Sequence, residues 1–286
     1  LTSARRFDTS EPMKSRIQPH FIEAGSGPPL LLLHGLFDSL ETWERLIPRL
    51  SAQFRVYALD LPAFGRSALP DDWPESLTGM VDTVICFFDA RGIEKISVAG
   101  SSMGGGLALA VAQRAPSRID KIALLNPYAL PETPFAVRNA RRPFVGALLP
   151  YLLRKRAIRC CAKGIFARSL FDKALLTEPL VERVAHPFYT LARRKNLFRF
   201  LRGISPAKIR EIDENLSKIE QPALIIWGTE DGWLSDAHWR RLEARLPRAR
   251  VMHLPQCGHL PQLEQPEAVA KALIPFFLGK DSQVTP

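Results

Sequence analysis

The sequence is poor in cysteine and has no long apolar run. Its 286 residues include four cysteines, whose spacing matches no metal site: Cys86, Cys160, Cys161 and Cys257. A chain of this length needs no disulfides, so we expect reduced thiols and a cytoplasmic setting. No apolar stretch reaches the roughly 20 residues that span a bilayer. The longest, PPLLLLHGLF, is interrupted by a His-Gly pair and is typical of a buried strand.

The first residues and the charge distribution limit the partners that we expect. Residues 1–15 lack the apolar core of a secretory signal, and we expect a flexible N-terminal extension there. The net charge is +10, and residues 127–218 hold 19 Lys and Arg against 7 Asp and Glu. No zinc finger, basic zipper or RNA-binding motif accompanies this charge, so we expect no nucleic-acid partner. We interpret the segment as a solvated basic face, with peripheral contact to an anionic membrane as the alternative.

Short apolar runs alternate with helical patterns along most of the chain. We predict buried strands at 29–33, 54–61, 95–100, 121–126, 222–228 and 249–254. We predict helices at 39–50, 80–92, 103–115, 236–246 and 266–279. This alternation indicates the α/β class with a mostly parallel sheet flanked by helices. It stops between 127 and 218, which predicts a helical cap inserted into a core of residues 16–126 and 219–280.

Two adjacent serines follow the predicted strand at 95–100, in the sequence GSSMGG. The pattern Gly-x-Ser-x-Gly fits only with Gly100, Ser102 and Gly104, so Ser102 rather than Ser101 is the candidate nucleophile. The glycines let strand and helix approach closely, and the helix N-terminus offers N–H groups to an oxyanion. We expect the backbone N–H of Met103 to be one such donor.

A serine nucleophile needs a base and an acid, which follow it in the order acid, then histidine, on this architecture. His259 lies in a loop after the predicted strand at 249–254 and is the candidate base. His238 lies inside a predicted helix, and we expect it at the surface. The candidate acid is Asp231, after the strand at 222–228, with Glu230 as the alternative.

A second oxyanion donor is expected from HGLFDS, after the strand at 29–33. The N–H of Leu36, or alternatively of Phe37, could lie beside that of Met103. We expect the His34 side chain to hydrogen-bond loop backbone and to take no part in catalysis. Trp233 follows the acid, and its side chain either lines an acyl pocket or packs in the core.

Five motifs resemble those of the α/β-hydrolase fold family. They are HGLFDSLETW, LDLPAFGRS (with Ala63 where glycine is usual), GSSMGG, WGTEDGWL and CGHLPQLEQPEAV. The resemblance implies a Ser-His-Asp hydrolase with an inserted cap, without metal or organic cofactor. Ser102 excludes the dehalogenase and epoxide hydrolase pattern, in which aspartate stands at this position.

The resemblance leaves the subgroup open between monoacylglycerol lipase-like esterases and carbon–carbon bond hydrolases of aromatic degradation. The latter usually carry Asn before the serine and Gly-His-Trp at the histidine, where this chain has Ser101 and Leu260. We therefore predict a carboxylic-ester hydrolase for apolar acyl esters, including acylglycerols, with Phe37, Trp233 and Leu260 as substrate-binding residues. The alternatives are the carbon–carbon hydrolase, a cofactor-free perhydrolase, or a ligand-binding receptor on the same scaffold.

The predicted cap carries apolar residues that we expect to line the pocket for the acyl or alcohol part of the substrate. They are Phe135, Phe144, Leu148, Leu149, Tyr151 and Leu152.

Overall fold

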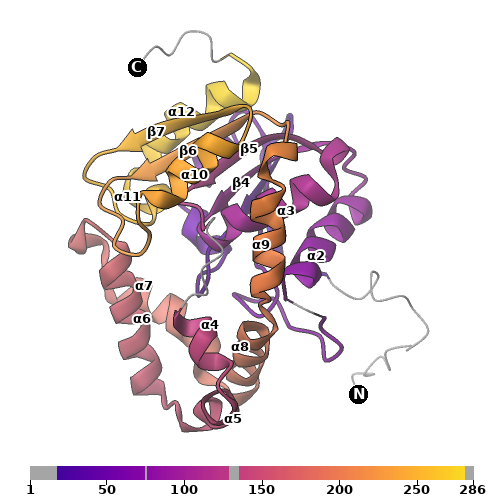
Figure 1. The fold of residues 1–286 in the computed structure, drawn as a ribbon. Coiled ribbons are helices and arrows are strands. Elements are labelled where there is room, and N and C mark those ends of the chain that lie inside the picture. Colours follow the sequence, from indigo (N-terminus) through magenta and orange to yellow (C-terminus); the bar gives the residue numbers. More distant parts are fainter. Residues whose placement is uncertain (1–17, 75, 129–134, 281–286) are drawn as a thin grey trace, which may run out of the picture.

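Buried runs of Leu, Ile, Val and Ala form a seven-stranded sheet in the computed structural model (Figure 1), which describes residues 18–74, 76–128 and 135–280. The strands are β1 (Phe21–Ala24), β2 (Pro29–Leu33), β3 (Arg55–Leu59), β4 (Ile96–Ser101), β5 (Ile119–Leu125), β6 (Ala223–Gly228) and β7 (Ala249–Leu254). Their order across the sheet is β1-β3-β2-β4-β5-β6-β7. β1 is antiparallel to β3, and the other neighbouring pairs are parallel. The six predicted strands are confirmed; β1 was not predicted.

The helices surround this sheet and continue beyond one of its ends. They are α1 (Ile47–Leu50), α2 (Ser76–Ala90), α3 (Met103–Arg114), α4 (Phe135–Ala140), α5 (Pro143–Leu152), α6 (Lys155–Ser169), α7 (Glu178–Ala185), α8 (Leu191–Gly203), α9 (Pro206–Glu214), α10 (Ala237–Arg245), α11 (Pro261–Glu264) and α12 (Pro266–Leu278). The expected helix at 39–50 is wrong as a single element. A 3₁₀ turn (Leu40–Trp43) and the short α1 stand in its place. Pro48 lacks the N–H that a continuous helix would use there.

Alternate side chains of β2 enter the cores on the two faces of the sheet. Leu31 and Leu33 lie in the core shared with α2, α3 and α10. Leu30 and Leu32 lie in the core shared with α1 and α12. This period of two is what a strand requires, and burial on both faces explains why β2 is apolar throughout.

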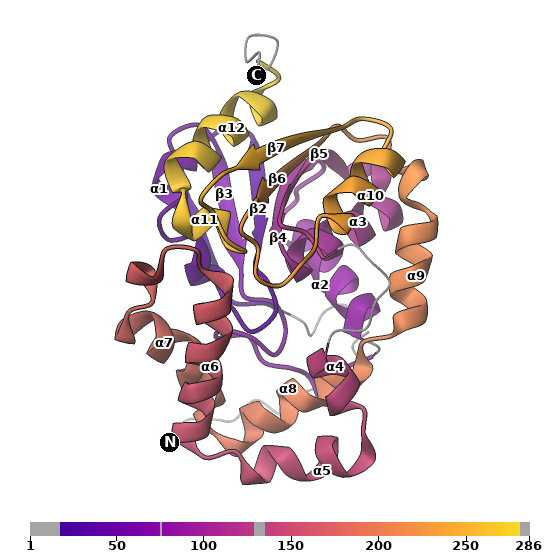
Figure 2. The same ribbon diagram turned by 60° about the vertical axis from the view of Figure 1, so that its left-hand side comes forward.

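The chain between β5 and β6 contains α4 to α9. In Figures 1 and 2, α4 to α8 lie beyond the end of the sheet, whereas α9 runs beside α3. These helices fall within residues 127–218, although the exact limits of the predicted cap stay a prediction. The expected N-terminal extension at 1–15 lies outside the described residues. Within residues 18–280 as described, no helix is both long and apolar enough to cross a membrane.

Candidate active site

Ser102 lies in a sharp turn between β4 and α3. Its backbone has φ 51° and ψ −115°, a strained conformation for a residue other than glycine. A Cβ on Gly100 would lie 2.2 Å from the carbonyl oxygen of Gly104, and one on Gly104 would lie 2.2 Å from that of Leu33. Both glycines therefore allow the strand and the helix to pack closely enough to hold this turn.

His259 and Asp231 are hydrogen-bonded at the same end of the sheet. The Nδ1 of His259 is 2.7 Å from Oδ2 of Asp231, whose side chain is buried. The other oxygen, Oδ1, accepts N–H groups from Trp233 (2.7 Å) and Leu234 (3.0 Å). Burial acts to raise the pKa of Asp231, but the hydrogen bonds and the facing His259 outweigh it, so the pKa is lowered. This carboxylate is therefore held ionised beside the imidazole.

Asn126 is a site residue that the sequence reasoning missed. Its Nδ2 donates to Oδ2 of Asp231 (2.6 Å), and its Oδ1 accepts the N–H of Gly228 (2.9 Å). The signal was present, because Asn126 follows β5 and Asp231 follows the neighbouring β6. The search for a carboxylate after each strand passes over an asparagine, although its amide can donate to the carboxylate and fix it.

The loop that carries His259 is attached to the end of α6. The N–H of His259 donates to the carbonyl of Ser169 (2.6 Å). Glu264 accepts the N–H of Gly258 through Oε1 (2.9 Å) and that of Phe171 through Oε2 (2.6 Å). Burial raises the pKa of Glu264, although these hydrogen bonds oppose the shift. One side chain thus joins the histidine loop to the inserted helices.

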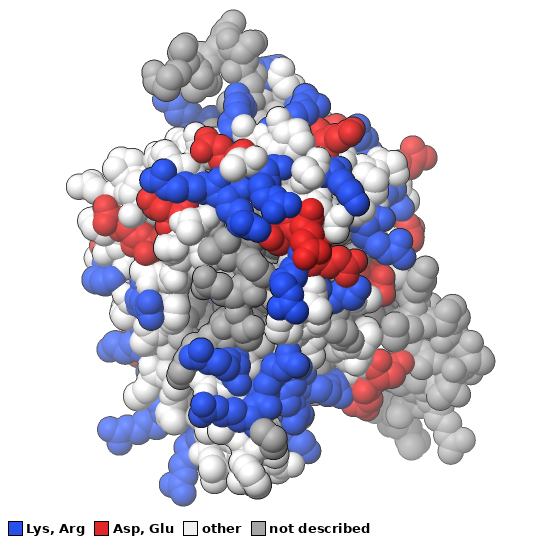
Figure 3. Space-filling model, in the orientation of Figure 1, with Lys and Arg blue, Asp and Glu red and all other residues white. Residues whose placement is uncertain are grey.

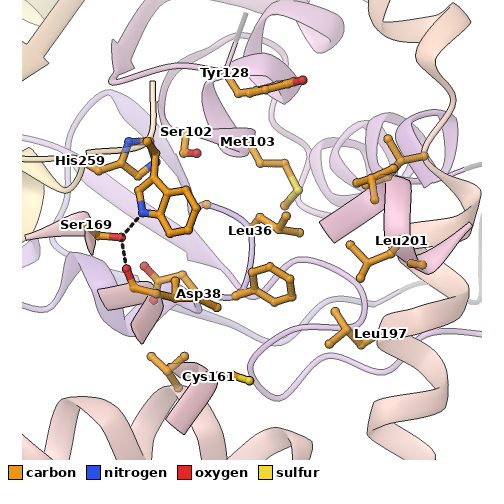
Figure 4. Close-up of a pocket in the computed structure, with 18 of the residues that line it drawn as sticks. Leu36, Asp38, Ser102, Met103, Tyr128, Cys161, Ser169, Leu197, Leu201 and His259 are labelled. Atoms are coloured by element: carbon orange, nitrogen blue, oxygen red, sulfur yellow. Dashed lines mark hydrogen bonds between the residues drawn. The ribbon is translucent and has the colours of Figure 1, made fainter. Parts of the chain in front are cut away.

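A cavity of about 950 Å³ lies between the end of the sheet and the inserted helices. Ser102, His259 and Met103 line it (Figure 4). Gly35 lines it as well. Met103 is the first residue of α3, so the helix offers its N–H no partner. An N–H in that position is available to an oxyanion beside Ser102.

The expected substrate-binding side chains also reach this cavity. Phe37, Trp233 and Leu260 line it, as does Leu36, the expected oxyanion donor. Trp233 is 41% exposed and donates its indole N–H to Oγ of Ser169 (2.9 Å), so it lies at the cavity wall and not in the core. Glu230, the alternative acid, is exposed and does not line the cavity.

His34 and Asp38 are buried in the loop after β2. Nε2 of His34 accepts the N–H of Leu61 (2.9 Å) and Nδ1 faces the carbonyl of Gly35 (2.7 Å), which confirms its expected structural role. Burial lowers the pKa of His34 and raises that of Asp38. Asp38 Oδ1 accepts the N–H of Ser39, whereas its Oδ2 has no hydrogen-bond partner among the described residues.

Two expectations about side-chain positions are wrong. His238 is not at the surface: it is 4% exposed, lines the cavity and packs against Tyr128 with ring centroids 5.8 Å apart. The helical pattern around it did not show that the start of α10 faces the cavity. Of the expected pocket residues of the predicted cap, Leu149 lines the cavity. Four others are exposed to solvent: Phe144, Leu148, Tyr151 and Leu152. The side chain of Phe135 is outside the described residues.

Comparison with known proteins identifies the family. The model of the alpha/beta hydrolase fold family matches residues 28–266. The chain belongs to the alpha/beta hydrolase fold family. Within the part of this hydrolase that the structure describes, no group of three His, Cys, Asp or Glu side chains could hold a metal ion.

Relatives of this alpha/beta hydrolase include an uncharacterized hydrolase and a dienoate hydrolase. It is 28% identical over 253 residues to the uncharacterized hydrolase YugF of Bacillus subtilis, covering 87% of this chain and 89% of that one. It is 27% identical over 282 residues to the 2-hydroxy-6-oxo-6-phenylhexa-2,4-dienoate hydrolase of Burkholderia cepacia, covering 96% of each. Among solved structures, a meta-cleavage product hydrolase from Pseudomonas fluorescens IP01 is 25% identical with a TM-score of 0.77, covering 93% of this chain and 96% of that one.

Proposed function

We propose that this alpha/beta hydrolase cleaves carboxylic esters with an apolar acyl group through a covalent acyl-enzyme. The observation that carries the proposal is the cavity that holds Ser102 and His259, because most of its wall is Leu, Ile, Val, Phe and Ala. A fully apolar acyl chain loses no hydrogen bonds on entering such a cavity and gains free energy from burial. We propose residues 127–218 as the cap that supplies much of this wall.

The reaction assigns one role to each group. Ser102 Oγ attacks the ester carbonyl while His259 takes its proton, and His259 then protonates the leaving alcohol. Asp231 fixes the imidazole tautomer and stabilises its protonated form, with Asn126 orienting the carboxylate. The N–H groups of Met103 and Leu36, with Phe37 as the alternative donor, stabilise the oxyanion. Water activated by His259 then hydrolyses the acyl-enzyme, so no metal or organic cofactor enters the cycle.

Carbon–carbon bond hydrolysis is the second candidate, and the description of the Burkholderia cepacia relative favours it. A dienoate substrate brings a carboxylate, which needs a polar partner in the cavity. Arg168 and Arg194 reach the cavity wall. Arg194 already donates to three backbone carbonyls at 2.7 to 3.0 Å, and the Arg168 guanidinium lies 4.3 Å from the Trp233 ring centroid. Their existing contacts favour the ester over the dienoate.

Substrate profiles separate the two candidates. We expect kcat/KM for p-nitrophenyl esters to rise by about 10-fold or more from acetyl to a medium or long acyl chain, as apolar contacts accumulate. We expect 2-hydroxy-6-oxo-6-phenylhexa-2,4-dienoate to be cleaved with a kcat/KM at least ~100-fold below that of the best ester. The reverse ranking would replace the proposal with the second candidate. Binding of these compounds without turnover would favour the alternative that the protein is a ligand-binding receptor on the hydrolase scaffold.

A further inference from the structure

Helix α5 exposes a row of large apolar side chains, which we name the α5 face. It consists of Phe144, Leu148, Tyr151 and Leu152. Phe144 is 82% exposed and Leu152 is 69% exposed. Their spacing of four, three and one residues puts them on one side of the helix. Large apolar side chains grouped on a surface mark a site of interaction with a protein or a membrane.

The opposite side of α5 is apolar as well. Val145 and Leu149 line the cavity that also holds Ser102 and His259, and so does Leu153, which directly follows the helix. Residues 143–152 include no Asp, Glu, Lys or Arg. A helix that is apolar on all sides is normally covered on all sides, by protein or by lipid. In this protein α8 and α4 pack against part of α5, and no element among residues 18–74, 76–128 and 135–280 covers the α5 face.

Positive charge surrounds the α5 face, and we name this set the basic rim. It consists of the exposed residues Arg141, Arg142, Arg154, Lys155, Arg156, Lys195 and Arg202. The first two precede α5, the next three follow it, and the last two lie on α8, which packs against it. Lys195 Nζ is 5.5 Å from the Tyr151 ring centroid, which links the rim to the face.

The basic rim has little negative charge to neutralise it. Residues 134–171 contain nine Lys and Arg and no Asp or Glu. Among the described residues, no Asp or Glu forms an ion pair with a member of the rim. Figure 3 shows Lys and Arg side chains gathered around uncharged residues at the lower end of the molecule, where α5 lies in Figure 1.

We infer that the α5 face and the basic rim form a docking surface for a bilayer that contains anionic phospholipid. An apolar helix face enters the boundary between headgroups and acyl chains, and the surrounding Lys and Arg attract the negative surface. A second copy of this chain fits less well, because the two basic rims would meet with like charge. A polar nucleic acid would leave the exposed Phe and Leu side chains without a partner.

Docking in this way would put one wall of the cavity against the membrane. The two sides of α5 then face the lipid and the cavity, so one helix separates an apolar ester dissolved in the bilayer from the cavity that holds Ser102. This consequence for the substrate class, a lipid-borne ester, rests on the proposed function. The docking itself does not, because it is measured without turnover.

Sedimentation with vesicles tests the docking surface. The full chain carrying Ser102→Ala, which prevents lipid hydrolysis, is mixed with vesicles of phosphatidylcholine alone or with added phosphatidylserine. We expect at least ~10-fold stronger partitioning to the anionic vesicles and its loss at about 1 M salt, where the Debye length falls to about 3 Å. Equal binding to both vesicle types, or no binding to either, would overturn the inference.

Two pairs of substitutions separate the contributions of the face and the rim. Phe144→Ser with Leu152→Ser removes exposed apolar surface, and Arg154→Glu with Lys155→Glu reverses charge at the start of α6, where an acid suits the helix dipole. We expect each pair to weaken binding to anionic vesicles by about 10-fold or more. The matched charge control is Lys271→Glu, inside α12, with Lys280→Glu, two residues beyond that helix. Helix α12 lies far from α5 in Figure 1, so this pair should leave binding unchanged.

The same variants distinguish docking from misfolding and from self-association. In the background with Ser102 intact, the Phe144→Ser, Leu152→Ser pair should hydrolyse a short soluble ester at an unchanged rate, because neither side chain lines the cavity. If this pair instead converts a dimer to a monomer in sedimentation velocity while vesicle binding is absent, the α5 face is an interface between copies, and the inference is wrong. Loss of the proposed esterase activity with vesicle binding intact would overturn only the proposed function.

Discussion

Three non-glycine residues at the active site have left-handed backbone torsions. Phe37, Ser102 and Asn126 have φ angles of 63°, 51° and 40°. Each lies just beyond a parallel strand, β2, β4 or β5. Such torsions cost on the order of 1–3 kcal/mol each and persist only where the surrounding packing holds them. In this protein these torsions turn the chain sharply beyond the carboxyl ends of the three strands, where the cavity begins.

The hydrogen bonds of Asn126 lead to a prediction for turnover. Asn126→Gly keeps a residue that accepts the left-handed torsion but removes the amide that holds Asp231. We expect kcat to fall about 10-fold or more with KM changed by less than about 2-fold, because a positioning contact is lost and no substrate contact.

The matched control for this prediction is Asn215→Gly, at the end of α9 and outside the cavity, which should leave kcat unchanged. An unchanged kcat in Asn126→Gly itself would contradict the positioning role.

Asp38 gives a prediction for stability. Burial raises its pKa in the folded protein, so the folded state binds this proton more tightly than the unfolded state does. The contribution to stability is therefore present at low pH and is lost as pH rises above the unfolded pKa of about 4. We expect Asp38→Asn to increase the free energy of unfolding by about 1 kcal/mol at pH 7, because a buried charge is removed. When the free energy of unfolding is measured by urea denaturation, this gain should disappear as the pH is lowered to about 4, the unfolded pKa. A gain that is independent of pH would refute the assignment.

At the scale of the elements, apolar runs and motif order were enough to predict the six strands from β2 to β7 and the strand-to-helix turn. β1 could not be predicted, because FIEA is short and only partly buried, and its pairing with β3 depends on distant residues. Order and spacing along the chain were enough to propose the triad residues. The structure places Ser102 and His259 at one cavity, with Asp231 hydrogen-bonded to His259. Asn126 and the link from Glu264 to the inserted helices depend on which loops are neighbours, which spacing along the chain does not reveal.

The junction of β4 and α3 gives a prediction at the same scale. Gly100→Ala puts a methyl group 2.2 Å from the carbonyl oxygen of Gly104, so strand and helix must separate. We expect it to lower the free energy of unfolding by about 2 kcal/mol or more, measured by urea denaturation.

The comparison is Gly164→Ala inside α6, where an added Cβ meets nothing within 4 Å. There we expect stabilisation by about 0.5–1 kcal/mol, because alanine favours the helix. Equal effects at the two positions would contradict the packing argument.

At the scale of the whole molecule, the insertion of helices after β5 converts the open end of a sheet into a cavity. Leu149 faces inward while Leu148 faces outward, although both are leucines of one apolar helix. The sequence of α5 could not distinguish these sides, because the contrast between apolar and polar residues that usually marks them is absent. The same lack of contrast is what makes the α5 face a candidate for contact with lipid.

The measurement that tests the central claim most directly is covalent labelling by a fluorophosphonate, read by intact-protein and peptide mass spectrometry. Such a reagent phosphonylates a serine that a neighbouring base activates and an oxyanion site assists. The account predicts one adduct per chain, on Ser102, retained in Ser101→Ala and absent in Ser102→Ala. An adduct on another residue, or no adduct on a folded wild-type chain, would contradict the assignment of Ser102 as the nucleophile.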